Sequence, residues 1–255
     1  MNVGVTGATG RMGRTVLDVL DDRNVAVAFA VSRSGPANGP ADQSIESADG
    51  FGDLLAAHDV DVVVDFSAPA ASVGYAEAAA DAGVPIVVGT TGFADEEIQA
   101  LESAGERTPV LVGANFARGV QALISAVETA VASLPKYDVE LTETHHNGKR
   151  DAPSGTANVI LDRIDAARGT EATRVHGREG EAPRSDDEIG VHARRAGDVT
   201  GEHEVLLAGN RETVSLSHRA GSRAVFAAGA VDAAAWLTEQ EPNYYRFSDI
   251  ADELT

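Results

Sequence analysis

Cysteine is absent from the 255-residue sequence, which excludes disulfide scaffolds, thiolate zinc sites and thiol nucleophiles together. Lysine is almost absent as well: Lys136 and Lys149 are the only lysines, and the other basic residues are arginines. No apolar run approaches the roughly 20 residues that a membrane span needs. The N-terminus lacks the basic segment and following apolar segment of a secretory signal. These absences predict a cytoplasmic protein with no membrane partner.

Positive charge is scarce relative to negative charge. Asp and Glu number 40 against 20 Lys and Arg, which gives a formal net charge of −20 and a pI of about 4.6. Such a surface repels nucleic acid and anionic membranes, so no nucleic-acid partner is expected. It also repels itself unless salt screens the charge. This composition is what a halophilic cytoplasm would select, although an ordinary acidic protein of a mesophile is the alternative.

The first part of the chain alternates short apolar runs with helical stretches, which is typical of a parallel sheet covered on both faces. The expected strands are Asn2–Thr6, Val25–Val31, Val60–Asp65, Pro85–Val88 and Val110–Val112, and the expected helices are 12–20, 51–57, 70–82 and 94–105. Residues 34–43 are rich in glycine and proline and are expected to form a loop. The fold class is therefore α/β with a doubly wound parallel sheet.

A smaller α+β domain with a mixed or antiparallel sheet is expected after residue 116. The expected elements are a helix at 118–133, a strand at Tyr137–Thr144, a helix from Ser154 to Ala167, strands at 202–208 and 212–218, and a helix at 222–238. The predicted domains are a dinucleotide-binding domain at 1–116, completed by 222–255, and a second domain at 117–221. At roughly 150 residues per domain, the length indicates about 1.7 domains.

Three glycines directly after the first strand indicate a cofactor site. Gly7, Gly10 and Gly13 form G-x-x-G-x-x-G at the start of the first helix, which departs from the usual G-x-G-x-x-G. Glycines there permit a tight turn and close backbone approach, and the helix N-terminus offers N–H groups to a pyrophosphate. A tight turn that binds no ligand is the alternative.

The end of the second strand indicates which cofactor is used. An acidic residue usually stands there and accepts hydrogen bonds from the adenosine ribose. This chain instead has Ser32, Arg33 and Ser34. An arginine beside two hydroxyls favours a 2′-phosphate, hence NADP over NAD. The alternative is that Arg33 is a solvated loop charge.

Small and polar residues follow two later strands, at the edge where such a sheet binds its ligand. The turn Gly89–Gly92 contains two threonines that could contact the ribose or nicotinamide, although a simple strand-to-helix turn is the alternative. Asn115 and Phe116 follow the next strand, where an amide could position a carboxamide and a ring could cover the nicotinamide. Packing at the domain junction is their alternative role.

Segment 143–156 is the part of the chain richest in groups able to do chemistry. Two adjacent histidines, His145 and His146, precede Lys149, whose ammonium can donate a proton or hold a carboxylate. Alternatively, Lys149 has no function and is a lysine that this lysine-poor chain retains by chance. Adjacent histidines on a strand point to opposite faces, so no metal site is predicted. No G-x-S-x-G motif supports a serine hydrolase.

These segments together closely resemble the dihydrodipicolinate reductase family. The matching segments are GATGRMG at 7–13, GTTG at 89–92, ANFARGV at 114–120, HHNGKRDAPSGTA at 145–157, RRAGDVTGEHEV at 194–205 and RAVFAAGAVDAAAWL at 223–237. The resemblance runs from end to end. It implies an NAD(P)H-dependent enzyme of lysine and diaminopimelate biosynthesis that reduces 4-hydroxy-tetrahydrodipicolinate, a small dicarboxylate, to tetrahydrodipicolinate. It also implies a homotetramer assembled through the second domain.

The resemblance implies roles for individual residues at the matching positions. The implied cofactor-binding residues are Gly7, Ala8, Thr9, Gly10, Arg11, Met12, Arg33, Gly89, Thr90, Thr91, Gly113, Ala114, Asn115 and Phe116. The implied substrate-binding residues are His146, Gly155 and Thr156. His145 would donate or accept a proton and Lys149 would donate one, because hydride arrival leaves charge on the conjugated ring that an acid must quench.

One residue departs from the family pattern, and two other functions are alternatives to the reductase. The family often has an acidic residue where Ser32 stands and accepts both cofactors, so NADPH is the expected preference with NADH possible. A semialdehyde or homoserine dehydrogenase would share the front half but has no reason for the 145–156 segment. A non-catalytic dinucleotide sensor needs no proton donors, and a DNA-binding sensor should carry a basic face.

Overall fold

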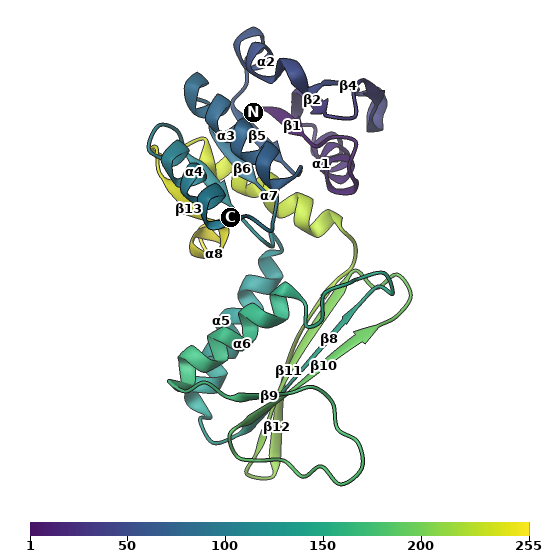
Figure 1. Cartoon of the computed structure of the whole chain (residues 1–255), viewed down its shortest axis with the longest axis vertical. Coiled ribbons are helices and arrows are strands. Elements are labelled where there is room, and N and C mark those ends of the chain that lie inside the picture. The colour runs from purple at the N-terminus through teal and green to yellow at the C-terminus, as the bar shows by residue number, and fades with distance from the viewer. Residues whose placement is uncertain (255) are drawn as a thin grey trace. The chain divides into compact units, whose positions relative to one another are not determined.

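The computed structural model describes residues 1–254 and divides into two compact units (Figure 1). Unit 1 comprises Met1–Ala117 together with the segment that begins at Arg223, and unit 2 comprises Arg118–Ser222. Each unit has its own sheet.

Unit 1 is built on an eight-stranded sheet in the order β13-β7-β6-β5-β1-β2-β4-β3. Its strands are β1 (Asn2–Thr6), β2 (Ala26–Ser32), β3 (Ala37–Asn38), β4 (Ser44–Ser47), β5 (Val62–Asp65), β6 (Ile86–Val88), β7 (Val110–Val112) and β13 (Tyr244–Arg246). All neighbours pair in parallel except β3 and β4. The doubly wound parallel sheet that the sequence predicts is confirmed.

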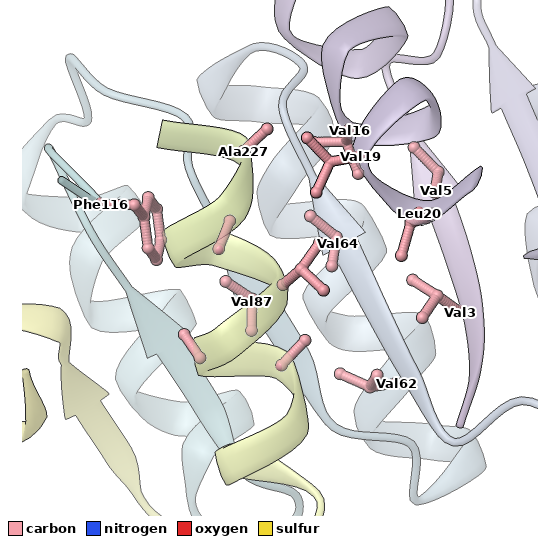
Figure 2. Close-up of a cluster of buried hydrophobic side chains, with 14 of the residues drawn as sticks. Val3, Val5, Val16, Val19, Leu20, Val62, Val64, Val87, Phe116 and Ala227 are labelled. Carbon is pink, nitrogen blue, oxygen red and sulfur yellow. The ribbon is translucent and has the colours of Figure 1, made fainter. Parts of the chain in front are cut away.

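Helices cover both faces of this sheet, which is why its central strands are apolar throughout. The helices are α1 (Arg11–Asp22), α2 (Phe51–Ala57), α3 (Pro69–Ala82), α4 (Asp95–Gly105), α7 (Ala224–Leu237) and α8 (Phe247–Ile250), with short turns η1 (Pro40–Asp42) and η2 (Ala48–Gly50). Val62 and Val64 belong to the core on the side of α1 and α7, whereas Val63 belongs to the core on the side of α2, α3 and α4 (Figure 2). Successive strand residues point to opposite faces, so a strand between two helical layers has no polar side.

Helix α7 is made largely of small residues, and close packing requires them. A side chain at Gly229 would collide with the carbonyl oxygen of Phe116. Ala227, Ala230 and Ala234 are also buried, so α7 lies close to the sheet. The helical tail predicted to complete the first domain lies in unit 1.

Four short elements of unit 1, namely β3, η1, β4 and β13, depart from the sequence-based expectation. Residues 34–43, expected to be a loop, contain β3 and η1, and β4 follows them. Strand β4 buries one residue, Ile45, so it carries no alternation that a pattern could reveal. Strand β13 is three residues long and extends the sheet only because it pairs with β7.

Unit 2 combines two helices with a mixed five-stranded sheet in the order β12-β11-β8-β10-β9. Its elements are α5 (Arg118–Ser133), β8 (Asp138–His145), α6 (Gly155–Arg168), β9 (Thr173–Val175), β10 (Glu188–Arg195), β11 (Gly201–Gly209) and β12 (Glu212–Ala220). Strands β8, β10 and β9 are parallel, and β11 runs antiparallel to β8 and β12. The sequence predicted a sheet that is either mixed or antiparallel, and the observed sheet is mixed.

Alternation along β8 separates a buried side from a half-exposed side. Val139, Leu141, Glu143 and His145 are buried, whereas the residues between them are mostly more exposed. Two polar residues therefore occupy buried positions that an apolar pattern would fill with aliphatic side chains.

Candidate active site

Two of the three glycines in the turn after β1 leave no room for a side chain. Gly7 has φ +66°, and a side chain there would collide with the carbonyl oxygen of Phe66. A side chain at Gly13 would collide with the carbonyl oxygen of Gly7, which also accepts a 2.9 Å hydrogen bond from the Gly10 N–H. Only glycine fits at Gly7 and Gly13, because backbone atoms occupy the space that a side chain would need.

The N-terminus of α1 has no side-chain cap and no acidic residue in its first turn. Helix α4 differs, because the Glu97 carboxylate accepts a 2.8 Å hydrogen bond from Ala94 N–H and acidic residues fill its first turn. The N–H of Ala8 is already used by the Val31 carbonyl at 3.1 Å. The positive end of the α1 dipole is left without an internal anion, as a phosphate-binding helix requires.

The end of β2 joins the glycine turn through hydroxyl groups. Ser32 is buried, its Oγ lies 2.6 Å from Thr9 Oγ1, and it accepts a 3.2 Å hydrogen bond from Ser34 N–H. Arg33 is exposed beside them. The structure thus brings Thr9 and Ser32 together, and Arg33 is the next residue of the chain.

A buried carboxylate, Asp65, organises the loops that follow β1, β5 and β6. It accepts hydrogen bonds from the hydroxyls of Thr6, Ser72 and Thr90, the last at 2.9 Å. Thr90 Oγ1 also accepts a 3.0 Å hydrogen bond from Ser67 N–H. The sequence-based reasoning missed Asp65, although a lone acid at the end of an apolar strand was a signal that could have found it.

The other predicted cofactor residues of unit 1 differ in exposure. Thr91 and Ala114 are exposed, while the Phe116 ring is 1% exposed and packs 4.7 Å, centroid to centroid, from the ring of Phe247. Asn115 Oδ1 accepts a 2.9 Å hydrogen bond from Ala117 N–H. The Phe116 ring is thus a core side chain.

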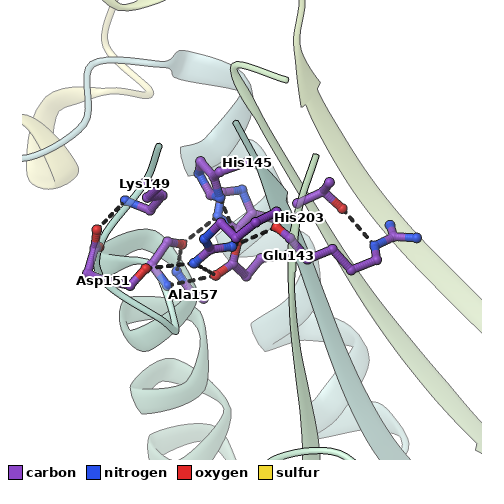
Figure 3. A network of polar contacts seen from close by, with 10 residues as sticks. Glu143, His145, Lys149, Asp151, Ala157 and His203 are labelled. Atoms are coloured by element: carbon purple, nitrogen blue, oxygen red, sulfur yellow. Dashed lines mark hydrogen bonds and ion pairs between the residues drawn. The ribbon is translucent and has the colours of Figure 1, made fainter. Parts of the chain in front are cut away.

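In unit 2, a polar cluster lies at the carboxyl end of β8 (Figure 3). Glu143 is 0% exposed, and His203 from β11, 3% exposed, stands opposite it in the strand register. The His145 ring lies 5.2 Å from the His203 ring in an edge-to-face arrangement. Arg195, the last residue of β10, is the register partner of His145.

Both oxygens of Glu143 are fully used. Oε2 lies 2.6 Å from His145 Nδ1 and 2.8 Å from Arg195 Nη1, and Oε1 accepts from Arg195 Nη2 at 2.8 Å and Ser154 N–H at 3.1 Å. Burial raises the pKa of Glu143, but the hydrogen bonds from Arg195 and His145 outweigh it and hold this pKa below its usual value. The carboxyl is therefore an anion inside the unit.

The two histidines of the cluster are held in their neutral forms by burial. Burial lowers the pKa of His145, the Glu143 carboxylate opposes this, and the charges of Lys149 and Arg195 lower it further. Burial also lowers the pKa of His203 to about 4. His203 Nε2 lies 2.9 Å from Ser154 Oγ.

The loop after β8 carries Lys149, whose Nζ lies 2.9 Å from Asp151 Oδ1. The Lys149 side chain is 21% exposed and that of Asp151 is 57% exposed. Hydrogen bonding to Lys149 lowers the pKa of Asp151. The backbone carbonyl of Asp151 accepts a 2.6 Å hydrogen bond from Arg195 Nη2, so this loop is tied to β10.

The N-terminus of α6 adjoins the cluster through its cap. Ser154 Oγ accepts a 3.1 Å hydrogen bond from Ala157 N–H, so the predicted cap is confirmed. Gly155 and Thr156 form the first turn. His146 is half-buried and makes no contact with the Glu143 carboxylate, so it lies outside the network that includes His145.

Sequence reasoning missed Arg195 and His203 and assigned Glu143 no role. The spacing of Glu143 two residues before His145 was a signal that both share one face of a strand. The partners on β10 and β11 carry no such signal, because only sheet pairing brings them close. Among residues 1–254, no group of three or more His, Asp or Glu side chains could hold a metal ion. Every helix in that range is too short or too polar to cross a membrane.

A doubly wound sheet with a glycine turn at an uncapped helix, joined to a second unit with buried proton-carrying groups, defines an NAD(P)-dependent oxidoreductase. Comparison with known proteins specifies it further. Residues 1–116 match the N-terminal part and residues 119–251 the C-terminal part of dihydrodipicolinate reductase. The chain belongs to the dihydrodipicolinate reductase family, as the sequence resemblance predicts.

Relatives that carry the name 4-hydroxy-tetrahydrodipicolinate reductase match almost the whole chain. The protein of Natronomonas pharaonis is 55% identical over 249 residues, which cover 98% of this chain and 99% of that one. The protein of Haloarcula marismortui is 51% identical over 251 residues, 98% of each chain. Both organisms are halophilic archaea, in agreement with the prediction from charge.

Solved structures agree with the family assignment. The dipicolinate-bound dihydrodipicolinate reductase of Paenisporosarcina sp. TG-14 has a TM-score of 0.79 and 25% identity, and covers 98% of this chain and 99% of that one. An aspartate semialdehyde dehydrogenase from Vibrio cholerae has a TM-score of 0.53 and 14% identity. That second likeness extends to the fold alone.

Proposed function

We propose that this protein reduces 4-hydroxy-tetrahydrodipicolinate to tetrahydrodipicolinate with NADPH, as a step of lysine and diaminopimelate biosynthesis. The observation that carries the proposal is the pairing of His145 with the buried Glu143 carboxylate at the end of β8, next to the loop that carries Lys149. Family membership over nearly the whole chain supports the same reaction.

The residues of unit 1 fit a dinucleotide. A side chain at Gly7 or Gly13 would fill the turn, and α1 offers an uncapped N-terminus, so residues Gly7–Met12 would hold the pyrophosphate. NADPH, when bound, supplies the hydride. Exposed Arg33 would meet the 2′-phosphate, since Ser32 provides no carboxylate to receive a ribose hydroxyl. NADPH is therefore the preferred cofactor and NADH the weaker one.

Two further segments would flank the nicotinamide end of the cofactor. Gly89–Thr91 follow β6 and Gly113–Phe116 follow β7, at the carboxyl edge where doubly wound sheets bind ligands. The hydroxyl of Thr90 is committed to Asp65 and the ring of Phe116 to the core. Backbone groups and Asn115 would therefore make these contacts.

The substrate is a dicarboxylate, and unit 2 offers cationic groups and a helix dipole to hold it. Lys149 and His146 would supply positive or hydrogen-bonding groups, and Gly155 and Thr156 lie in the first turn of α6, where the dipole favours an anion. The 4-hydroxyl leaves as water and the ring becomes conjugated; when hydride reaches that ring, negative charge develops elsewhere in it. His145 or Lys149 would transfer the one proton that quenches this charge.

The two units would have separate roles in a homotetramer. Unit 1 binds the cofactor, and unit 2 binds the substrate and makes the subunit contacts of a homotetramer. One face of the sheet in unit 2 would supply these contacts, because alternate residues of β8 and β11 on it are mostly half-buried and those of β12 are exposed. The proposed location is the cytoplasm.

The test is NADPH oxidation by the purified protein in concentrated KCl, with substrate generated in the assay from pyruvate and aspartate semialdehyde by the preceding synthase. Parallel reactions contain NADH, or low salt. Substrate-dependent oxidation that is faster with NADPH supports the reaction and the role of Arg33. A folded protein that binds NADPH but oxidises none would refute the substrate assignment.

A further inference from the structure

We infer that Glu143, clamped by Arg195, is the positioning residue that places the proton of neutral His145 on Nδ1 and turns Nε2 toward the reacting substrate. This inference rests on the proposed function for the reaction that His145 serves. Neither Glu143 nor Arg195 needs to contact the substrate in the proposed reaction.

The hydrogen bonds of the Glu143 carboxylate determine the tautomer. An ionised carboxylate accepts hydrogen bonds and donates none. Arg195 supplies two donors at 2.8 Å, and Ser154 N–H supplies a third at 3.1 Å. The remaining contact, 2.6 Å to His145 Nδ1, must therefore be a bond that the ring donates.

The other ring nitrogen lies against Gly201, a position that has no side chain. A side chain at Gly201 would come within 3.1 Å of His145 Nε2. With Nδ1 carrying the proton, neutral Nε2 has a lone pair there and can accept a proton, or donate one once the ring is charged. A ring with the opposite tautomer would present a bare lone pair to Glu143 and lose its strongest contact.

Stability alone does not explain a carboxylate buried in this way. A buried ion pair is often no more stabilising than packed aliphatic residues of similar volume. On the opposite side of β8, Glu140 binds Arg184 and lies 2.8 Å from His192 Nε2, but Glu140 and His192 are considerably more exposed than Glu143 and His145. A glutamate of β8 therefore meets an arginine and a histidine twice, and only Glu143 is fully buried beside Lys149 and the α6 cap.

The cations around the His145 ring favour its neutral form, and Glu143 is the group that orients the ring. The charged and titratable groups that face His145 are Glu143 from β8, Arg195 from β10, His203 from β11 and Lys149 from the loop after β8. The cations lower the pKa of His145, and Glu143 alone raises it. Loss of the Glu143 charge should therefore lower the pH at which His145 loses its proton.

The decisive variant is Glu143→Gln, studied in the full-length protein. We expect kcat to fall by roughly 10²- to 10⁴-fold, because a neutral amide no longer selects the tautomer, while the KM for NADPH stays unchanged. Nitrogen-15 NMR of the histidine side chains should show the Nδ1–H form in the wild type and a mixture of tautomers in the variant. The His145 titration should move to lower pH.

Glu140→Gln is the matched control, because it removes a carboxylate from the same strand that also binds an arginine and a histidine. It should leave kcat, its pH profile and the His145 signals unchanged. If the Gln variant does not fold, Glu143→Asp keeps the charge for Arg195 but shortens the reach to His145. We expect that variant to fold, lose about tenfold in kcat and show a weaker tautomer preference.

Three results would overturn the inference. They are an Nε2–H tautomer of His145 in the wild type, a folded Glu143→Gln variant with wild-type kcat, or His145 signals that stay unchanged in Glu143→Gln or Glu143→Asp. The NMR readout needs no substrate. Failure of the proposed reaction would therefore appear as absent NADPH oxidation with the tautomer result intact.

Discussion

In unit 1, the strands β5 and β6 are buried on both faces and stay aliphatic until Asp65, where β5 ends. In unit 2, β8 buries Glu143 and His145 on the same side as its aliphatic residues. Unit 1 therefore offers ligands its loops and backbone N–H groups, whereas unit 2 offers ionisable side chains carried by the sheet itself. Substitutions should affect cofactor binding in the first unit and turnover in the second.

The largest effect is expected from Lys149→Ala in unit 2. Loss of the ammonium removes the proposed proton donor and should lower kcat by roughly 10²- to 10⁴-fold, while the Kd for NADPH, measured by fluorescence titration, stays the same. Lys136→Ala is the control, because Lys136 is exposed and has no assigned role. Near-normal turnover of the Lys149 variant would remove this residue from the mechanism and break the contrast between the units.

The next effect is expected from Gly7→Ala in unit 1. The new side chain would collide with the Phe66 carbonyl, so the turn must shift and the KM for NADPH should rise about 10- to 100-fold, with kcat at saturation changed less. Gly83→Ala is the control: Gly83 has φ +68°, yet nothing lies within 4 Å of its added side chain. A Gly7 variant that binds NADPH as tightly as the wild type and the Gly83 variant would contradict the prediction.

A pH dependence of stability should come from His203 in unit 2. Its pKa of about 4 lies below the ordinary 6.5, so the unfolded chain binds more protons between these values and stability falls as pH drops from 6.5 toward 4. By linkage, the loss attributable to this residue is about 2 kcal/mol between pH 7.5 and pH 5. Urea unfolding of the wild type and His203→Gln at both pH values measures it. A variant that loses as much stability as the wild type would contradict the assignment.

The smallest effect is expected at the cofactor site of unit 1. Arg33→Ala should weaken NADPH binding by about 5- to 10-fold, because a charge-assisted hydrogen bond to phosphate is lost, and should leave NADH binding almost unchanged. Arg107→Ala, at an exposed arginine paired with Asp81, is the control. If NADPH and NADH weaken equally in the Arg33 variant, Arg33 does not recognise the 2′-phosphate.

Most elements of unit 1 could be predicted because their signals are local. Glycine spacing, apolar runs and helix periodicity lie within a few consecutive residues, and β1, α1 and α2 follow them closely. The strands β3, β4, β9 and β13 have two to four residues each and lack the continuous aliphatic run that revealed the equally short β6 and β7. They form because a neighbouring strand edge supplies hydrogen-bond partners, which is a tertiary effect.

The candidate site divides in the same way. His145, Lys149 and the Ser154 cap are close in sequence, so their association could be predicted. Arg195 and His203 are about 50 residues further along, and only the register of β8 with β10 and β11 brings them to Glu143.

The sequence by itself determined the family, the doubly wound sheet, the glycine turn and the segment that carries the chemistry, because each is written in neighbouring residues. Only the tertiary structure decided that Glu143 is an anion, that His145 donates from Nδ1 and that the Phe116 ring is a core side chain. Those properties depend on burial and on partners from distant strands. Burial and distant partners arise when the sheets form, because sheet pairing joins residues at any separation along the chain.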